Sequence, residues 1–509
     1  MPKFYLTTAI DYSNGDPHLG HALEKVGADC IARYHRLRGD QVHFVMGMDE
    51  HGQKVAQAAE KSGLPPQAWV DRIAARFADT WANLGCSNDD WIRTTEPRHT
   101  ASVIAFIERI RRHHPDDIFI GEYEGWYCIG CEEFKQAAQI VDGRCVEHPT
   151  LTLQRTRETN YFFRLSRYAE RLHALITAGE FRVEPAIRRN EVLRLLEQGL
   201  EDVSISRARF PWGIPFPGAP DHTVYVWFDA LINYITAAGF PDAGFERLWP
   251  ADLHVIGKGI TRLHCALWPA MLLSAELALP RMVWAHGYVQ WGGAKVSKSA
   301  GGALSVDEAI AYHGADALRY FLLREVGFEN DGDFTWERFD ARYTSELADT
   351  LGNLVSRSLT MIVNYRGGTV PRDPRNYATP LESAAATALA AYARAMDANH
   401  LPDGAAQLVA LASAANRYVE ETAPYKLAKQ PDRAAELDSV LANLARTVAR
   451  LAVLAQPFLP TTARTVWATL GSAEPLERVR LRDLDRLDPA GQRVERPPIL
   501  FPKPRLAPA

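Results

Sequence analysis

The N-terminal region contains two histidines and a glycine at a spacing suited to phosphate binding. They lie in the run Pro17-His18-Leu19-Gly20-His21, between an apolar stretch and a helical pattern. A helix N-terminus binds anions through its free backbone N–H groups and its dipole. Gly20 lets the backbone approach a ligand, and the two imidazoles would face its phosphates. Cytidylyltransferases use the same string, and the alternative interpretation is that these are two ordinary surface histidines.

A second run, Lys295-Val296-Ser297-Lys298-Ser299, places two lysines in a segment with glycine pairs on both sides. This composition suits a mobile clamp on a triphosphate. A solvated basic loop is the commoner role of such a string. The two runs in this order, around a split parallel sheet, are far more specific together than either is alone.

A third set of residues has the spacing of a zinc site. Cys128-x-x-Cys131 is followed, after 13 intervening residues, by Cys145-x-x-His148. Three thiolates and one imidazole form a closed tetrahedral set, which leaves no open position for a substrate. The spacing therefore predicts a structural zinc ion. The alternative is a group of unrelated buried cysteines.

Alternating strand and helix patterns surround the phosphate-binding runs. Phe4–Ile10 predicts a strand, Ala22–Leu37 a helix that ends at Gly39, and Val42–Met46 a second buried strand. This rhythm predicts an α/β fold with a Rossmann-like parallel sheet and ligands at the carboxyl ends of its strands. Three later runs are predicted to be further strands: Tyr225–Phe228, Leu253–Ile256 and Val283–Tyr288.

The remaining chain divides by composition. A region rich in Cys, Gly and Arg separates the two halves of the sheet domain, and reads as an insertion. Ser383–Met396 and Arg433–Leu454 have apolar residues at i, i+3 and i+4, which predicts a helical bundle. The last stretch is Pro-rich and predicts a surface strap. The expected regions are 1–117, 118–222, 223–325, 326–370, 371–487 and 488–509.

Composition narrows the class of protein. The 509 residues are 47% hydrophobic and 23% charged, and no apolar run approaches the roughly 20 residues of a membrane span. Six cysteines are too few for a disulfide scaffold, and the absence of a secretion signal favours the cytoplasm. A net charge of -5 argues against bulk binding to nucleic acid but not against a local basic face. Cys30, Cys86 and Cys265 are expected simply to be packed.

The histidine run at residues 17–21 and the lysine run at residues 295–299 resemble the two signature motifs of class I aminoacyl-tRNA synthetases, with Val296 in place of the usual methionine in the second motif. The wider chain, residues 3 to 480, resembles the methionyl-tRNA synthetase family. This resemblance implies a Rossmann-like domain with a zinc-knuckle insertion, a stem-contact region over 326–370 and an α-helical anticodon-binding bundle. It also rests on three further runs: Gly47-Met48-Asp49-Glu50-His51-Gly52, Tyr225-Val226-Trp227-Phe228-Asp229-Ala230 and Trp268-Pro269-Ala270-Met271.

The resemblance implies a reaction in two steps. The carboxylate of L-methionine attacks the α-phosphate of Mg²⁺-bound ATP, and the methionyl group then passes to the 3′ end of tRNA(Met). A carboxylate is already a nucleophile, so the first step needs positioning and charge stabilisation and no protein base. His18 and His21 are expected on the phosphates, and Lys295 and Lys298 on the leaving pyrophosphate.

The resemblance also assigns the binding residues. Asp49 would hold the substrate ammonium, and a thioether requires shape and soft aromatic contact. Simple core packing is the alternative for Trp227. The thioether pocket would comprise Ile10, Tyr12, Trp227, Ala230, Tyr234, Ile260 and His264. ATP would be bound by Gly20, Glu24, Gly257, Lys258, Ser297 and Ser299.

One position departs from the family. Gly259 stands where the family usually has an aspartate that contacts the ribose. A carboxylate–hydroxyl bond contributes about 1.5–3 kcal/mol, so ATP affinity is expected to depend on a substitute such as Glu24 or water.

In the helical half, the resemblance matches Asn353 and Arg357 to the pair that reads the CAU anticodon, and Tyr425 to a tryptophan that stacks on an anticodon base. Tyrosine stacks with less area, which predicts weaker binding and an unchanged code. A solvated helical face is the alternative for most of the arginines in this half: Arg357, Arg417, Arg446 and Arg450.

Two rival functions remain at this point. The first is another class I synthetase. Two observations argue against it: the insertion is too short for the editing domain of the isoleucine, valine and leucine enzymes, and a cysteine enzyme would bind its substrate with an open zinc site, whereas this zinc set is expected to be closed. A non-catalytic tRNA-binding paralogue is the other, favoured by Gly259, Val296 and Tyr425. A monomer is expected because no appended oligonucleotide-binding module is present.

Overall fold

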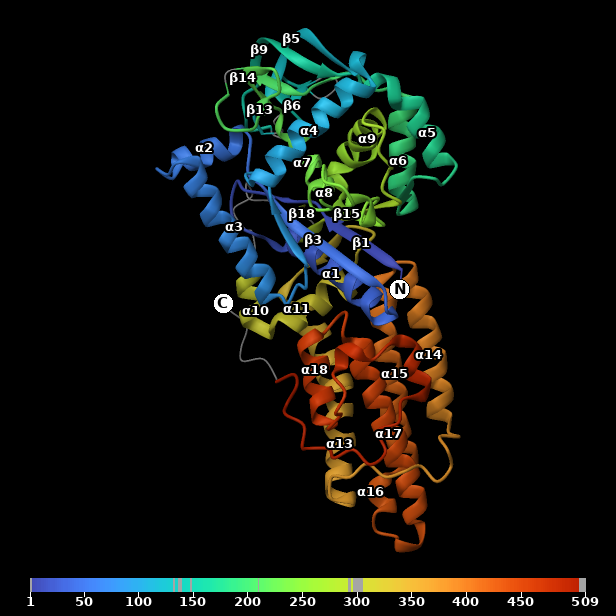
Figure 1. Cartoon of the computed structure of the whole chain (residues 1–509). Coiled ribbons are helices and arrows are strands. Elements are labelled where there is room, and N and C mark those ends of the chain that lie inside the picture. The colour runs from blue at the N-terminus through green and yellow to red at the C-terminus, as the bar shows by residue number, and fades with distance from the viewer. Residues whose placement is uncertain are drawn as a thin grey trace.

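The computed structural model has a sheet domain with its covering elements at one end and a long helical bundle at the other (Figure 1). No helix among the described residues has the length and hydropathy needed to cross a membrane. The structure describes residues 2–130, 133–135, 140–146, 149–208, 210–291, 294–295 and 305–502.

A seven-stranded parallel sheet lies at the centre of the larger domain. Its order is β10-β16-β15-β1-β3-β2, with β4 also paired to β3. The predicted strands over Phe4–Ile10, Val42–Met46, Leu253–Ile256 and Val283–Tyr288 are confirmed, within a few residues at their ends. The strands are β1 (Lys3–Thr8), β2 (Asp11–Tyr12), β3 (Gln41–Asp49), β4 (Asp90–Arg93), β10 (Arg182–Glu184), β15 (Leu253–Gly257) and β16 (Met282–His286).

Helix α1 (Leu19–Arg38) is confirmed where the apolar stripe predicted it. It begins at the cap residue His18 and ends at Gly39, whose φ of 98° places it in the left-handed region that favours glycine. Its buried side chains pack on the sheet. The chain outside the bundle contains further helices: α2 (Gln53–Lys61), α3 (Pro66–Asn83), α4 (Pro97–His113), α8 (Asn233–Thr236), α9 (Trp268–Ser274), α10 (Val306–His313), α11 (Ala315–Phe321) and α12 (Trp336–Arg342).

The expected insertion over 118–222 is not one separate unit. Its β-rich part forms the far end of the molecule (Figure 1), where β5 (Ile118–Cys128) pairs along its length with β9 (Gln154–Phe163). Its middle part, however, returns to the main sheet, because β10 pairs in parallel with β16. The remaining elements are β6 (Glu133–Lys135), β7 (Ile140–Val141), β8 (Arg144–Cys145), β11 (Val203–Ser204), β12 (Ser206–Ala208), β13 (Pro215–Phe216), β14 (Ala219–Val224), α5 (Ala169–Thr177) and α6 (Ala186–Glu197).

The prediction of a strand over Tyr225–Phe228 is wrong. Strand β14 ends at Val224, and the run forms helix α7 (Val226–Leu231) instead. A short apolar run has no periodicity that separates a buried strand from a buried helix. In the helix, the buried Asp229 carboxylate contacts two histidines.

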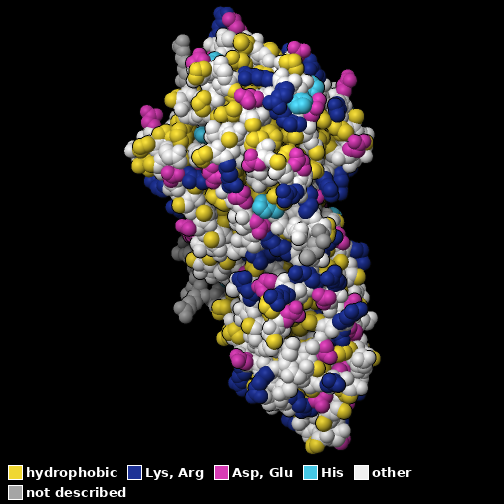
Figure 2. Space-filling view, viewed as in Figure 1, with side chains coloured by type: hydrophobic (Ala, Val, Ile, Leu, Met, Phe, Trp, Pro, Cys, Tyr) yellow, Lys and Arg dark blue, Asp and Glu magenta, His cyan; other side chains and the backbone are white. Residues whose placement is uncertain are grey.

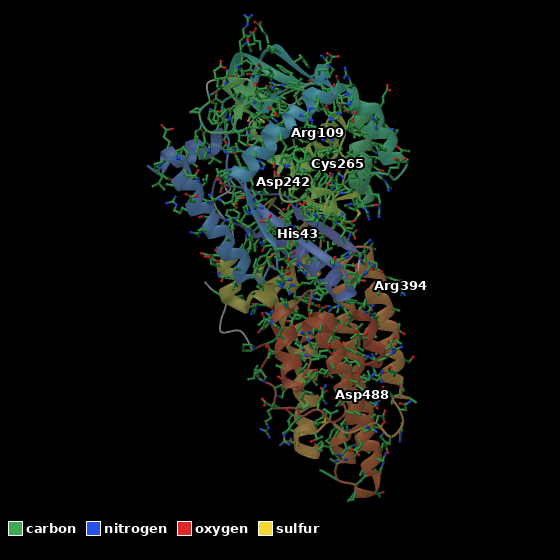
Figure 3. The ribbon with its side chains drawn as sticks, in the orientation of Figure 1. His43, Arg109, Asp242, Cys265, Arg394 and Asp488 are labelled. Carbon is green, nitrogen blue, oxygen red and sulfur yellow. The ribbon has the colours of Figure 1, made fainter. Side chains whose placement is uncertain are left out.

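The C-terminal half is a helical bundle, as predicted. Its helices are α13 (Asn353–Arg366), α14 (Pro380–Asp397), α15 (Leu401–Thr422), α16 (Pro424–Leu427), α17 (Ala434–Ala455) and α18 (Pro460–Thr469). The chain after α18 runs over the bundle, where Asp488 lies in Figure 3 and accepts a hydrogen bond from the Tyr377 hydroxyl. Phe501 then packs near Gly352.

The interpretation of the arginines as a solvated helical face is wrong for two of them. Arg446 and Arg450 are buried in α17, and Arg450 forms an ion pair with Glu382 at 2.6 Å. These two side chains join α17 to Glu382 of α14 and to the backbone of residues 484 and 485. Arg417 is exposed, as that interpretation requires.

One buried arginine ties the two halves of the molecule together. Arg319 donates to Asp29 of α1 at 2.7 Å and to the Pro457 carbonyl of the bundle at 2.8 Å, and is fully buried. A single hydrophobic cluster also runs from α1 into the bundle. The bundle is therefore docked on the sheet domain by a shared core.

Candidate active site

The sheet topology places a ligand crevice between β1 and β15. The chain leaves β1 toward β3 on one side, whereas β15 continues to β16 on the other, so the strand order reverses at this point. Ligands of open parallel sheets bind outside the carboxyl ends of the strands at such a reversal. The sequence runs predicted to bind substrates follow these ends: Tyr12 pairs with Asp49, and Gly257 pairs with His286.

The two histidines form the cap of α1. The His18 Nδ1 accepts from the Gly20 N–H at 3.1 Å, and the His21 Nδ1 accepts from the His18 N–H at 3.2 Å. Their rings stack at a centroid distance of 3.7 Å. Because each Nδ1 accepts, each neutral ring carries its proton on Nε2, where it is a donor for an anion. A side chain at Gly20 would meet the His18 ring at 2.9 Å, so this arrangement needs glycine.

A buried charge network lies beneath this helix start, and sequence reasoning found only Glu24 of it. Lys25 contacts Asp11 at 3.0 Å and Glu24 at 2.8 Å, and His286 lies 3.2 Å from the second Glu24 oxygen. Burial raises the pKa of Asp11 to about 6 against the opposing effect of Lys25. Burial also acts to raise the pKa of Glu24, but Lys25 and His286 bring it below its ordinary value. The network joins β2 and the end of β16 to α1.

The expected thioether pocket contains a neutral tyrosine–histidine pair. Tyr234 donates its hydroxyl to the His264 Nε2 at 2.7 Å, because the His264 Nδ1 donates to the Ile260 carbonyl at 3.0 Å. Burial lowers the pKa of His264 to about 4. His264 lies on a π-helical turn, Leu263–Leu267, a geometry frequent at functional sites. An uncharged, aromatic wall of this kind suits a thioether.

The other expected pocket residues lie on two facing elements. Tyr12 and Trp227 have ring centroids 6.2 Å apart, and Trp227 is only half-buried, which core packing does not explain. Ala230 is buried one turn along α7. Ile10 lies 3.0 Å from the position that a Cβ at Gly47 would occupy.

A buried aspartate between two histidines fixes α7, and the sequence analysis assigned it no role. Asp229 lies 2.6 Å from the His51 Nδ1 and 2.7 Å from the His99 Nε2. Burial acts to raise the pKa of Asp229, but the two histidines hold it below its ordinary value. His51 and Asp229 both lie inside quoted sequence runs; only His99, far from both, gave no signal. The three side chains position the helix that carries Trp227.

The lysine run lies mostly outside the described residues. Ser297, Lys298 and Ser299 belong to that part, and for Lys295 the structure gives the backbone, in β18 (Ala294–Lys295). This strand pairs with β17 (Val289–Trp291), which also pairs with β19 (Gly332–Phe334). Lys258 is described: it forms an ion pair with Asp331 at 2.7 Å.

Half of the expected zinc set is described. Cys128 and Cys145 are both buried and share one small hydrophobic cluster with Leu153, whereas Cys131 and His148 lie outside the described residues. Two distant cysteines brought into one cluster fit a knuckle. Within the described part of the chain, no group of three or more metal-binding side chains occurs. Cys265 differs, because it lies in the interior of the sheet domain (Figure 3) and burial raises the pKa of its thiol.

The expected anticodon residues lie on neighbouring helices of the bundle. Asn353 is exposed on α13, and Arg357, one turn on, forms an ion pair with Glu420 of α15 at 2.6 Å. Tyr425 follows α15 and is 44% exposed, as a stacking platform must be. On the face shown in Figure 2, Lys and Arg side chains are interspersed with Asp and Glu.

Comparison with known proteins gives a consistent family. The family described as tRNA synthetases class I (M) matches residues 4–150 and 151–359, and the anticodon binding domain of methionyl tRNA ligase matches residues 372–505. A methionine–tRNA ligase of Caldanaerobacter subterraneus subsp. tengcongensis is 40% identical over 98% of this chain and 78% of its own. One of Streptomyces coelicolor is 39% identical over 99% of this chain and 97% of its own.

Solved structures agree. The Mycobacterium tuberculosis methionyl-tRNA synthetase in complex with methionyl-adenylate superposes with a TM-score of 0.93 at 39% identity, and 99% of this chain and all of that one are covered. The apo form of that enzyme gives 0.86 at 35% identity, covering 100% of this chain and 99% of the other. The sequence and the fold of the chain therefore match one family. This chain belongs to the methionyl-tRNA synthetases of class I.

Proposed function

We propose that the chain activates L-methionine with Mg²⁺-bound ATP and transfers the methionyl group to the 3′ end of tRNA(Met). The observation that carries the proposal is the shared crevice. The capped start of α1, with His18 and His21, and the neutral Tyr234–His264 pair both lie at the carboxyl ends of the same parallel sheet. Phosphate recognition and thioether recognition thus converge there.

The activation step needs alignment more than acid–base catalysis. The substrate carboxylate attacks the α-phosphorus, and pyrophosphate leaves. His18 and His21 present Nε2–H donors and the α1 N-terminus adds its dipole, which stabilises charge on the phosphates. Mg²⁺ would arrive with ATP and neutralise the phosphate oxygens. Lys295 and Lys298 are proposed to hold the leaving pyrophosphate.

Methionine selection follows from the neutral Tyr234–His264 wall of the pocket. His264 is neutral at physiological pH, because burial lowers its pKa to about 4. A neutral wall with Trp227 and Tyr12 opposite suits a polarisable sulfur, and Asp49 is proposed to pair with the ammonium group. Sulfur makes weak hydrogen bonds, so contact shape supplies the discrimination.

The remaining assignments concern metal and partners. Cys128, Cys131, Cys145 and His148 are proposed to hold a structural zinc ion, supported by the shared cluster of Cys128 and Cys145. Asn353, Arg357 and Tyr425 are proposed to contact the anticodon of tRNA(Met). We propose a cytoplasmic monomer.

An ATP–pyrophosphate exchange assay tests the activation step. Methionine should support exchange, whereas isoleucine, leucine, valine and cysteine should support it at least about a hundredfold less well, a difference of roughly 3 kcal/mol. Exchange driven by another amino acid would overturn the substrate assignment. No exchange with any amino acid would favour a non-catalytic tRNA-binding role.

A further inference from the structure

A single buried ammonium group lies between the expected methionine pocket and an expected ATP-binding residue. Lys25 of α1 has no exposed surface. Its Nζ donates to the Ala9 carbonyl at 2.6 Å and to a Glu24 carboxylate oxygen at 2.8 Å, and an Asp11 carboxylate oxygen lies 3.0 Å away. A lysine ammonium has three N–H donors. Each of them therefore has an acceptor within the protein, and Lys25 holds protein groups and not a substrate.

Two of these acceptors belong to the segment that carries part of the expected methionine pocket. Ala9 and Asp11 lie on either side of Ile10, and Asp11 directly precedes Tyr12. Asp11 and Tyr12 form β2, which pairs with the end of β3. Lys25 therefore fixes the chain on both sides of Ile10, between the end of β1 and the start of β2.

The third acceptor is Glu24, an expected ATP-binding residue. Glu24 is buried, and its other carboxylate oxygen lies 3.2 Å from the His286 Nε2 at the end of β16. Lys25 and His286 thus engage one oxygen each, which sets the direction of the carboxylate. A shift of the ammonium group would therefore disturb the pocket segment and Glu24 together.

The positive charge of Lys25 is needed because it lies between two buried carboxylates. Burial acts to lower the pKa of Lys25, but Asp11 and Glu24 raise it above its ordinary value, so the ammonium is charged at neutral pH. Without it, the Asp11 and Glu24 carboxylates would repel each other in a largely buried site. Lys25 thus joins β2 to α1 across this site.

We propose that Lys25 is a positioning residue for the activation step, and that its ammonium group holds the methionine-pocket segment and Glu24 in a fixed relative arrangement. The inference rests on the proposed function, since both substrates belong to that reaction. Lys25 acts through Ala9, Asp11 and Glu24 and touches neither substrate. A change on the methionine side of Lys25 should therefore be felt on the ATP side.

This crossed effect gives the sharpest test. Asp11→Asn keeps the size of the side chain and removes the charge that Lys25 contacts, so the ammonium is drawn toward Glu24 alone. The KM for methionine in pyrophosphate exchange should rise about 3–10-fold, the effect of weakening one charge-assisted hydrogen bond. The KM for ATP should rise at least about threefold as well, although Asp11 lies beside the methionine pocket. An unchanged KM for ATP would overturn the inference.

A pair of variants separates positioning from stability. Lys25→Met leaves two buried carboxylates without their cation, so it should lower the unfolding temperature and raise both KM values. Adding Asp11→Asn removes one of these carboxylates and should recover part of the unfolding temperature, whereas both KM values should stay raised because no ammonium joins the two sides. KM values that recover together with the unfolding temperature would show a purely structural role and would overturn the inference. If Lys25→Met does not fold, Asp11→Asn alone decides.

Asp29→Asn is the matched control. Asp29 is a buried carboxylate four residues after Lys25 on α1, and its ion pairs are with Arg33 and Arg319. The control should lower the unfolding temperature and leave both KM values within about twofold of wild type. Equal rises of both KM values in Asp29→Asn and Asp11→Asn would mean that any weakening of α1 has this effect, and would overturn the inference.

The failure of this inference is distinguishable from the failure of the proposed function. If the wild-type protein exchanges no amino acid, the proposed function fails, and dissociation constants of methionine and ATP measured by calorimetry in wild type and Asp11→Asn still test Lys25. Binding of neither ligand would overturn both. If exchange with methionine is normal but Asp11→Asn changes the KM for methionine alone, the inference fails by itself.

Discussion

Removing one hydroxyl from the thioether pocket should weaken methionine binding and leave ATP binding intact. In Tyr234→Phe the His264 Nε2 loses its donor, at present 2.7 Å away, while its Nδ1 stays bonded to the Ile260 carbonyl. An unsatisfied buried acceptor costs about 1–3 kcal/mol of folding stability. The imidazole is also less firmly held before methionine binds, and re-ordering one side chain costs about 0.5–1.5 kcal/mol.

The second cost sets the kinetic effect. It corresponds to a rise of about 2–12-fold in the KM for methionine, measured by pyrophosphate exchange, whereas the KM for ATP should stay within about twofold of wild type. Tyr392→Phe is the matched control, because it removes an equally buried tyrosine hydroxyl, bonded to the Leu454 carbonyl in the bundle. It should lower the unfolding temperature and leave both KM values unchanged.

Two results would refute this reasoning. If Tyr234→Phe leaves the KM for methionine unchanged, the Tyr234–His264 pair does not order the pocket. If Tyr392→Phe raises that KM equally, the effect reports general loosening of the protein and has no connection with the pocket.

Three other predictions concern stability and metal. Arg319→Met should lower the free energy of unfolding by about 3 kcal/mol, because it leaves Asp29 buried with fewer partners; denaturant unfolding measures this, and an unchanged midpoint would refute the docking role. The pKa of His264 is about 4 in the folded protein and 6.5 in the unfolded chain. The stabilisation that neutral His264 gives the folded protein is therefore full above pH 6.5 and is lost as the pH falls from 6.5 to 4, which lowers the free energy of unfolding by about 3 kcal/mol in all. His264→Gln should flatten this part of the melting profile, and an equally steep profile would contradict the shift. Cys128→Ser should remove bound zinc measured by elemental analysis, whereas Cys86→Ser should retain it; zinc retained by both would exclude the proposed ligand set.

Sequence patterns predicted α1 and the bundle because each has a long, regular apolar period, and they predicted the parallel sheet from the alternation of strand-like and helical runs. The pattern failed at Tyr225–Phe228, where a short apolar run fits either a strand or a helix. The helix that forms there carries Asp229, whose partner His99 lies more than a hundred residues earlier in the chain. Contacts of this kind have no local period, so no reading of neighbouring residues finds them.

The same limit applies to the candidate site. Motif spacing predicted His18 and His21, and the family resemblance implied the pocket residues, but each motif is confined to a short segment. Lys25 and His286 complete a charge network that joins three elements, and neither stands out by type or spacing.

Aminoacylation of transcribed tRNAs tests the central claim most directly. With methionine and ATP, the chain should form methionyl-tRNA on a transcript of tRNA(Met) with the CAU anticodon, and changing that anticodon should reduce charging by at least about a hundredfold. Arg319 docks the helical bundle on the domain that carries the crevice. Charging should therefore require both the anticodon contacts of the bundle and the residues of the crevice. Formation of adenylate without transfer to this tRNA, or charging with another amino acid, would contradict the account.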